Sequence, residues 1–387
     1  MSVAANQAQV FLRLLRALRP RWHTDHALAR TIQSLLTGDR SFGSRDRRLY
    51  RELIYTTLRH LPWIEPWLEK EPAEVVRRAA WLAAELPATQ AFRAEFATGE
   101  APAGDRAELL PAWFRTECPE IFSGEELAAQ LRRAPLWLRL SGAASATLRE
   151  FDALRWAWHR SELLPNAVRM LDEVDVTRTQ AFQRGRIEVQ DMGSQMVLET
   201  LGIAPGGRWL DACAGAGGKS LQLARMISAS GTVEAYDIRP SALAELQERA
   251  VRAGARNIRL IARPSTGDYD GVLVDAPCSG SGTWRRSPHL KWTTTPALIA
   301  ERAELQHTLL AKFAHGVRPG GRLIYATCSL SVRENEQVVA RFLAGHEGFE
   351  PVPPAHAFGF TPRGDGLTIF PARHDTDGFF VAGFRRR

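Results

Sequence analysis

The spacing of apolar residues in the first hundred positions is that of helices. Apolar side chains recur every three or four positions in four segments, residues 9–18, 27–36, 45–59 and 72–85. Residues 97–105 are small, polar and rich in Gly and Pro, which is typical of a linker. The pattern therefore predicts an all-α domain over residues 1–105.

The next segment, residues 111–190, has a mixed pattern. Residues 125–133 have helical spacing, whereas residues 136–140 and 185–190 are typical of strands, the latter as an arm of a hairpin. We interpret residues 111–190 as a small α/β subdomain.

From residue 191 to residue 387, predicted strands and helices alternate. Apolar runs predict strands at residues 208–211, 232–237, 258–262, 271–276, 322–328 and 378–384. Helical spacing covers residues 219–227, 241–253, 295–317 and 335–344. This alternation predicts an α/β domain with a mostly parallel sheet covered on both faces. Ligands bind beyond the carboxyl ends of the strands in such a sheet. Four candidate side chains end predicted strands and should lie at this edge: Asp211, Asp237, Asp275 and Cys328.

Composition places the chain among soluble, globular proteins. Its 387 residues suffice for two or three domains, and hydrophobic and charged residues make up 45% and 24%. No apolar run reaches the roughly 18 residues of a membrane span, and the N-terminal residues do not resemble a signal peptide. We therefore expect a cytoplasmic protein that does not bind membranes.

The charge is compatible with a polyanionic partner. The net charge is +7, and all but four of the 50 basic residues are arginine. Eleven arginines and four acidic residues lie between residues 13 and 59, so the helical domain is locally basic. Solvated helix faces are the more common reason for such a charge distribution, and contact with RNA is the alternative.

Four cysteines are scattered along the chain: Cys118, Cys213, Cys278 and Cys328. They lack the close pairing of a zinc site and the density of a disulfide scaffold. We expect reduced thiols and no metal.

A glycine-rich loop, DACAGAGGKS, occupies residues 211–220. Three glycines before a helix allow a ligand to approach the backbone closely. The loop is not a P-loop, because Cys213 occupies the position of the first glycine, and it does not have the dinucleotide-binding spacing either. It remains compatible with a nucleoside cofactor.

Asp237 ends the second predicted strand, where a carboxylate accepts hydrogen bonds from ribose hydroxyls. It could instead serve as a turn or capping residue ahead of Ser241. S-adenosylmethionine has a ribose but no phosphate, so a glycine loop followed by a ribose-binding acid fits it better than ATP.

Two thiols, Cys278 and Cys328, follow strands that end at the same edge. A single cysteine is more often a packing residue, but two at one edge favour chemistry. A thiolate that adds to C6 of a pyrimidine makes C5 nucleophilic enough to accept a methyl group from a sulfonium. One thiol is enough for that step, and the residues alone leave open which one attacks.

The chain from about residue 189 onwards resembles the Sun (Fmu) family of S-adenosylmethionine-dependent RNA cytosine-5 methyltransferases. The resemblance is carried by DACAGAGGKS, VEAYDIRPSALAEL, VLVDAPCSGSGTWRRSPHLKW, ELQHTLL, VRPGGRLIYATCSLSVRENEQVV and DGFFVAGFRR. It implies a Rossmann-like class I methyltransferase domain over residues 191–387, with a mostly parallel seven-stranded sheet. RSFGSRDRRLYRELIYTTLRHL resembles the NusB-like helical domain of small-subunit ribosomal RNA methyltransferases of type B, and residues 111–190 resemble the RNA-binding subdomain before the catalytic core.

The resemblance also implies roles for individual residues. Cys328 attacks cytosine C6, Cys278 assists release of the 5-methylcytosine product, Asp275 orients the base, and Lys219 lies close to cofactor and base. The implied cofactor-binding residues are Asp211, Cys213, Ala214, Gly215, Ala216, Gly217, Gly218, Lys219, Asp237 and Asp275. The implied partner is RNA, in the first place 16S (small-subunit) ribosomal RNA, methylated by a monomer during rRNA processing.

The chain departs from the family pattern at several positions. The family carries proline at Ala216, threonine at Ser220, and Arg-Val-Asn where this chain has Arg139, Leu140 and Ser141. Residues 261–264 also lack the acid that recognises adenine in the family. Asp268 or a backbone amide could take its place.

Other functions remain as alternatives. A tRNA or another RNA could be the substrate. A DNA cytosine-5 methyltransferase would use Cys278 as its nucleophile, and the second thiol at Cys328 argues against it. The missing adenine acid would suit a non-catalytic RNA-binding assembly factor, but both cysteines are retained. An NTPase is disfavoured because the P-loop glycine is absent.

Overall fold

The computed structural model describes residues 2–142 and 144–387, and contacts within it divide the chain into two compact units. The first unit is Met1–Arg133 with Thr283–Pro296, and the second is Ala134–Gly282 with Ala297–Arg387. These boundaries differ from the three expected segments. Residues 111–133 group with the N-terminal helices, and the rest of the expected subdomain groups with the catalytic region.

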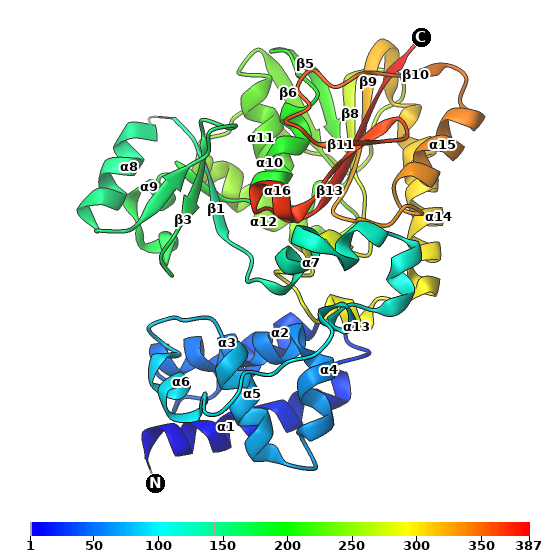
Figure 1. Cartoon of the computed structure of the whole chain (residues 1–387). Helices are drawn as coiled ribbons and strands as arrows, with labels where there is room; N and C mark the ends of the chain where they lie inside the picture. Colours follow the sequence, from blue (N-terminus) through cyan, green and yellow to red (C-terminus); the bar gives the residue numbers. More distant parts are fainter. Residues whose placement is uncertain (1, 143) are drawn as a thin grey trace. The chain divides into compact units, whose positions relative to one another are not determined.

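The first unit is helical, as the apolar spacing predicts. Its helices are α1 (Val3–Leu18), α2 (Leu28–Gly38), α3 (Ser44–Arg59), α4 (Leu61–Ile64), α5 (Pro72–Leu82), α6 (Gln90–Phe96), α7 (Gly124–Leu131) and α13 (Leu290–Thr293) (Figure 1). Phe11, Leu15 and Leu18 in α1 are spaced by four and three residues and are fully buried. One apolar stripe per helix thus builds the core of this unit.

The segment Thr283–Pro296 comes from the predicted catalytic region but packs within the first unit. Trp284 is fully buried, with its ring centroid 4.6 Å from that of Phe114. Lys291 is also buried, and its ammonium donates a hydrogen bond of 2.7 Å to the carbonyl of Arg59. Burial lowers the pKa of Lys291 well below its usual value.

The second unit begins with a small antiparallel sheet. Its elements are β1 (Leu136–Leu140), α8 (Ala144–Ala153), β2 (Trp158–Arg160), β3 (Ala167–Met170), α9 (Gln180–Gln183) and β4 (Ile187–Val189), with strand order β2-β3-β1-β4. Leu138 packs with Phe151 of α8 on one face, whereas Trp137 belongs to a core shared with the main sheet. Trp137 and Leu138 face different cores because successive side chains of a strand point to opposite faces of the sheet.

The main sheet has nine strands among the described residues: β5 (Gly207–Asp211), β6 (Gly231–Ala235), β7 (Ile258–Leu260), β8 (Tyr269–Asp275), β9 (Val317–Thr327), β10 (Phe349–Pro351), β11 (Thr361–Arg363), β12 (Gly366–Ile369) and β13 (Phe379–Arg386). Their order is β11-β12-β13-β9-β8-β5-β6-β7, and β10 also pairs with β13. Strands β5 to β9 run parallel, and β13 is antiparallel to β9.

The α/β class I fold is confirmed, but the sheet has more than the expected seven strands. Strands β10, β11 and β12 are only three or four residues long, too short for an alternating pattern.

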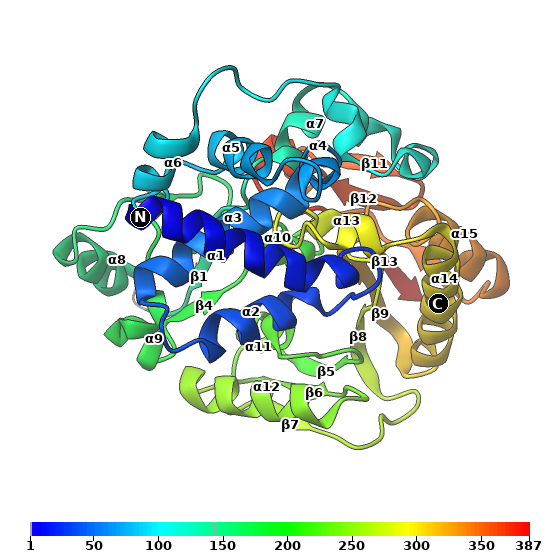
Figure 2. The ribbon, with the colours of Figure 1, turned by 90° about the horizontal axis from the view of Figure 1, so that it is seen from below.

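Helices cover both faces of this sheet (Figure 1). Helices α10 (Met192–Glu199), α11 (Gly218–Met226) and α12 (Pro240–Ala253) lie on one face, and α14 (Pro296–Ala314) and α15 (Glu336–Gly345) on the other. Adjacent residues of β5 show the division, because Trp209 packs toward α11 and Leu210 toward α14. Figure 2 shows α12 beside β6 and β7. A short helix, α16 (Pro371–His374), precedes β13.

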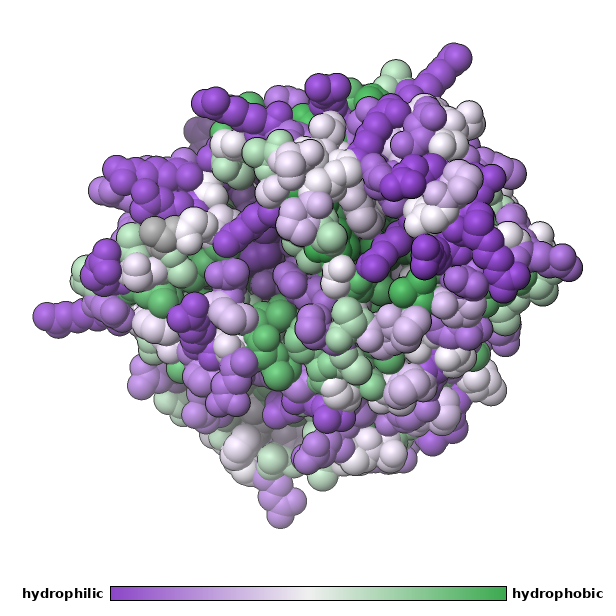
Figure 3. Space-filling view, turned by 90° about the horizontal axis from the view of Figure 1, so that it is seen from above, coloured by the Kyte–Doolittle hydropathy of each residue, from purple (hydrophilic) through white to green (hydrophobic). Residues whose placement is uncertain are grey.

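The surface is predominantly hydrophilic on the face shown in Figure 3, where hydrophobic residues form separate groups. Ile238 and Val251 are among the most exposed large apolar side chains. Across residues 2–142 and 144–387, the helices are too short or too polar to cross a lipid bilayer.

Candidate active site

Three neighbouring strands end side by side at one edge of the main sheet. Strand β5 ends at Asp211 and β8 at Asp275, and Cys328 directly follows β9. In the parallel register Asp275 lies opposite Ala326, so the ends of β8 and β9 are level. The fourth candidate, Asp237, follows β6 on the other side of β5. The structure therefore brings the four predicted side chains to the same edge.

The two thiols of this edge are in contact. The Sγ atoms of Cys278 and Cys328 are 3.3 Å apart, and the four cysteines are not joined by disulfide bonds. The hydrogen bond with Cys328, together with burial, raises the pKa of Cys278 well above its usual value. Two thiols at this distance cannot readily ionise together, so Cys278 keeps its proton when Cys328 is a thiolate.

Lys219 and Asp275 form an ion pair beside the thiols. Lys219 Nζ donates a hydrogen bond of 2.8 Å to Asp275 Oδ2 and lies 5.2 Å from the centroid of the Phe379 ring. Burial disfavours the charged amine, but the charge and hydrogen bond of Asp275, and to a smaller extent Cys328, raise the pKa of Lys219. Lys219 is therefore a buried cation close to Cys328.

A buried carboxylate, Glu334, connects the two cysteine loops. It accepts hydrogen bonds from the amide and hydroxyl of Ser279, next to Cys278, and from the hydroxyl of Ser329, next to Cys328. Glu334 is fully buried. Sequence reasoning used this glutamate only as part of a family motif and gave it no role.

The glycine loop has the left-handed backbone that its glycines predict. Gly215 has φ +52° and Gly217 has φ +87°, and a Cβ atom at Gly217 would clash with Leu246. Gly218, the first residue of α11, has open space where its Cβ would lie. At the start of the loop, Asp211 accepts a hydrogen bond of 2.6 Å from Ser220. Burial raises the pKa of Asp211 to about 7.

Asp237 contacts the loop directly, because its Oδ2 accepts a hydrogen bond of 2.8 Å from the amide of Gly215. Arg239 also binds this carboxylate, with Nε 3.0 Å from Oδ1 and Nη2 3.1 Å from Oδ2. The pKa of Asp237 is lowered because these hydrogen bonds outweigh its burial. Sequence reasoning missed Arg239, although its position two residues after Asp237 was a signal.

Two further predicted residues have other surroundings. Burial raises the pKa of Cys213 in the glycine loop, so this thiol stays protonated. Asp268 precedes β8 and lies 3.7 Å from Arg208 at the start of β5. It is therefore at the opposite edge of the sheet, and the idea that Asp268 replaces the adenine acid is wrong.

Comparison with known proteins places the chain in a family. The sequence profile described as 16S rRNA methyltransferase RsmB/F matches residues 198–385. Ribosomal RNA small subunit methyltransferase B of Klebsiella pneumoniae subsp. pneumoniae is 32% identical over 319 residues, which are 77% of this chain and 70% of that protein. The chain belongs to the RsmB/F family of methyltransferases.

Other RsmB/F relatives match a smaller part of their own length. The probable ribosomal RNA small subunit methyltransferase B of Bacillus subtilis is 34% identical over 242 residues, 59% of this chain and 54% of that protein. The chain thus spans about half the length of this relative. The crystal structure of PH0851 shares the fold, with a TM-score of 0.79, 20% identity and coverage of 100% of both chains.

The cofactor of this RsmB/F chain is S-adenosylmethionine, and the residues present fit it. The open space at Gly218 allows close approach to the backbone, and Asp237 lies beside Gly215 with a charged carboxylate suited to a ribose. Among the described residues, the His, Cys, Asp and Glu side chains form no group of three or more that could hold a metal ion.

Proposed function

We propose that this chain is an RNA cytosine-5 methyltransferase that acts on 16S ribosomal RNA in the cytoplasm, as a monomer. The observation that carries the proposal is the 3.3 Å contact between Cys278 and Cys328 beside the Lys219–Asp275 ion pair. This arrangement offers two sulfurs to one ring, which a methyltransferase without a covalent intermediate does not need.

The reaction begins when the Cys328 thiolate adds to C6 of cytosine. A bond forms between sulfur and C6, and the electron pair of the C5–C6 double bond moves to C5. S-adenosylmethionine would supply an electrophilic methyl group: C5 would accept it as the bond between the methyl carbon and the sulfonium sulfur breaks, and S-adenosylhomocysteine would leave. The C5 proton would then pass to a base, the C5–C6 double bond would form again, and the C6–sulfur bond would break to free the Cys328 thiolate. Cys278 assists this release.

The neighbouring charges suit these steps. Lys219 is a buried cation close to Cys328, on the side where the sulfur meets the base. Asp275 fixes the position of Lys219 and has a second carboxylate oxygen with which to orient the base. Asp237 and the loop from Cys213 to Lys219 hold the cofactor. Asp211 stabilises the start of that loop by accepting a hydrogen bond from Ser220.

The choice of RNA rests on the relatives and on charge. Two relatives are named as small-subunit ribosomal RNA methyltransferases, and the chain has a net charge of +7. A target cytosine must leave its base stack to meet Cys328, which favours a loop or an incompletely assembled particle as substrate. A transfer RNA or another RNA is the alternative, and the experiment below separates the two.

The test uses methyl-labelled cofactor with transcripts of 16S ribosomal RNA and of transfer RNA. Cys328→Ala should abolish transfer and form no adduct, because no sulfur remains to attack C6. Cys278→Ala should accumulate a covalent protein–RNA adduct on a denaturing gel, because release is slowed. Cys118→Ala, in the first unit, is the matched control and should behave as the wild type.

An adduct that persists in Cys328→Ala and disappears in Cys278→Ala would reverse the two roles. Methyl transfer to transfer RNA but not to 16S ribosomal RNA would change the substrate and keep the chemistry. A protein that binds RNA but neither transfers methyl groups nor forms an adduct would be an assembly factor, and the proposal would fall.

A further inference from the structure

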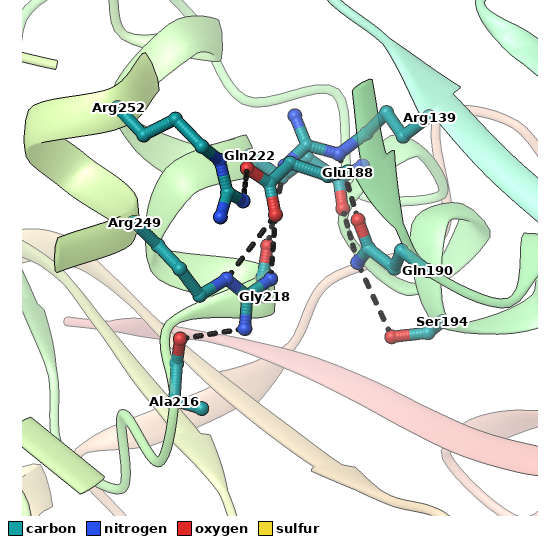
Figure 4. A network of polar contacts seen from close by, with 9 residues as sticks. All are labelled: Arg139, Glu188, Gln190, Ser194, Ala216, Gly218, Gln222, Arg249 and Arg252. Atoms are coloured by element: carbon teal, nitrogen blue, oxygen red, sulfur yellow. Dashed lines mark hydrogen bonds and ion pairs between the residues drawn. The ribbon is translucent and has the colours of Figure 1, made fainter. Parts of the chain in front are cut away.

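A buried polar network lies behind the cofactor loop, on the side of the small antiparallel sheet (Figure 4). At its centre is Glu188 of β4, whose side chain is only 3% exposed. Its carboxylate binds two arginines of α12: Arg249 through Oε2 at 2.8 Å and Arg252 through Oε1 at 2.8 Å. The network therefore links the small sheet to a helix of the main sheet.

Two arginines of this network contact the cofactor loop itself. Arg249 Nη1 donates a hydrogen bond of 2.7 Å to the carbonyl oxygen of Ala216. Arg139 of β1 donates through Nη2 to the carbonyl oxygen of Gly218 at 3.4 Å, and through Nε to Gln190 at 2.7 Å. The loop is thus held from behind by one side chain of the small sheet, Arg139, and by one side chain of helix α12, Arg249.

Arg252, unlike Arg249, has no described contact with the cofactor loop. It belongs to the same helix and the same ion pair, but its other described contact is with the ring of Phe182 at 4.2 Å, away from the loop. Figure 4 shows Arg249 reaching past Glu188 to Ala216, whereas Arg252 stops at Glu188. The two arginines share one anchor and differ in whether they touch the loop.

The loop needs such support because its glycine-rich backbone is little restrained by its own residues. Gly217 is left-handed, and the turn around it is closed by a hydrogen bond from its amide to the carbonyl of Ala214. A short glycine-rich loop has many other conformations in solution, and each one reduces the fraction able to bind a ligand. A charge-assisted hydrogen bond to Ala216, in the middle of the loop, selects one conformation.

We propose that Glu188 and Arg249 are positioning residues for S-adenosylmethionine, and that they fix the cofactor loop through the Ala216 carbonyl. Glu188 orients the guanidinium of Arg249, and Arg139 supports the first turn of α11 in the same way. The small sheet therefore contributes to cofactor binding without touching the cofactor. This inference rests on the proposed function only for its cofactor, and not on the RNA substrate or the two cysteines.

The test compares Arg249→Gln with Arg252→Gln in the full chain by calorimetric titration with S-adenosylmethionine. Arg249→Gln should weaken cofactor binding about tenfold, the effect of losing one charge-assisted hydrogen bond that orders the site. Its kcat at saturating cofactor should stay close to that of the wild type. Arg252→Gln should lower the melting temperature but leave the dissociation constant of the cofactor unchanged.

Two more variants keep the test decisive if Arg249→Gln does not fold. Arg249→Lys keeps the charge but not the fork that reaches Glu188 and Ala216 together, so it should also weaken cofactor binding. Glu188→Gln leaves both arginines in place and should raise the KM for cofactor, but not the KM for RNA.

Equal dissociation constants for Arg249→Gln, Arg249→Lys and the wild type would overturn the inference. Equal weakening by Arg249→Gln and Arg252→Gln would also overturn it, because the network would then act only on stability. A wild type that binds the cofactor tightly but methylates no RNA would contradict the proposed function and leave the positioning role intact.

Discussion

Each thiol of the candidate site depends on a neighbouring hydroxyl for its position. Ser279 and Ser329 stand one residue after Cys278 and Cys328, and both hydroxyls donate to Glu334. Gln306 of α14 adds a hydrogen bond of 2.9 Å to the same carboxylate. A single buried acid therefore sets the distance between two loops that are 50 residues apart in the chain.

We predict that Glu334→Gln lowers kcat for methyl transfer by at least tenfold. The amide nitrogen of glutamine must face one of the donors that Glu334 now accepts from, and a buried unsatisfied donor costs about 1–3 kcal/mol. Glu336→Gln, in the same motif, is the matched control, because Glu336 pairs with Arg363 at 3.1 Å. The kcat of each variant is measured with methyl-labelled cofactor. A folded Glu334→Gln enzyme with full activity would refute the positioning role of Glu334.

At the scale of elements, the cofactor site depends on the junction between β5 and α11. The loop between them must turn within a few residues, and the left-handed Gly217 is the N-cap residue directly before the helix. Leu246 of α12 packs so closely on this glycine that no side chain fits. Backbone conformation and helix packing thus impose the same residue at this position.

We predict that Gly217→Ala both destabilises the protein and weakens cofactor binding. The left-handed conformation alone costs an alanine about 1–2 kcal/mol, and the contact with Leu246 adds to it. Gly254→Ala is the control, because Gly254 also has positive φ, at the end of α12, but has open space around it and does not belong to the loop. Thermal melts should show that both variants are destabilised. Titration with S-adenosylmethionine should show weaker binding for Gly217→Ala alone. Unchanged cofactor binding by Gly217→Ala would contradict the prediction.

At the scale of the whole molecule, the two compact units are not continuous in sequence. The segment Thr283–Pro296 leaves the second unit directly after the Cys278 loop and contributes buried side chains to the first. Trp292 donates a hydrogen bond of 2.6 Å to the carbonyl of Leu58. The region expected to be the catalytic domain therefore contributes residues to both compact units.

We predict that a fragment of residues 134–387 binds a hydrophobic dye and melts at lower temperature than the full chain. Without the first unit, Trp284 and Trp292 lose the partners that cover them, and exposed aromatic surface promotes association. The same fragment with Trp284→Ser and Trp292→Ser should bind less dye. Equal dye binding by the original fragment and the full chain would show that the segment does not need the first unit.

The sequence by itself determined most helices and the parallel strands, and it indicated methyl transfer. Periodicity located the four N-terminal helices and β5 to β9 because long amphipathic segments and buried strands have strong local patterns. The glycine loop and the paired cysteines indicated a methyl transfer because few other reactions need that combination of residues. The resemblance to a family then gave each cysteine a role.

Only the tertiary structure decided which distant residues meet. It moved Thr283–Pro296 into the helical unit and placed Asp268 at the wrong edge for adenine. It also brought Glu334 between the cysteine loops and Glu188 behind the cofactor loop. These contacts join segments that are far apart in the chain. Local patterns do not predict them, because in the sequence a single glutamate that will be buried cannot be distinguished from one that will be exposed.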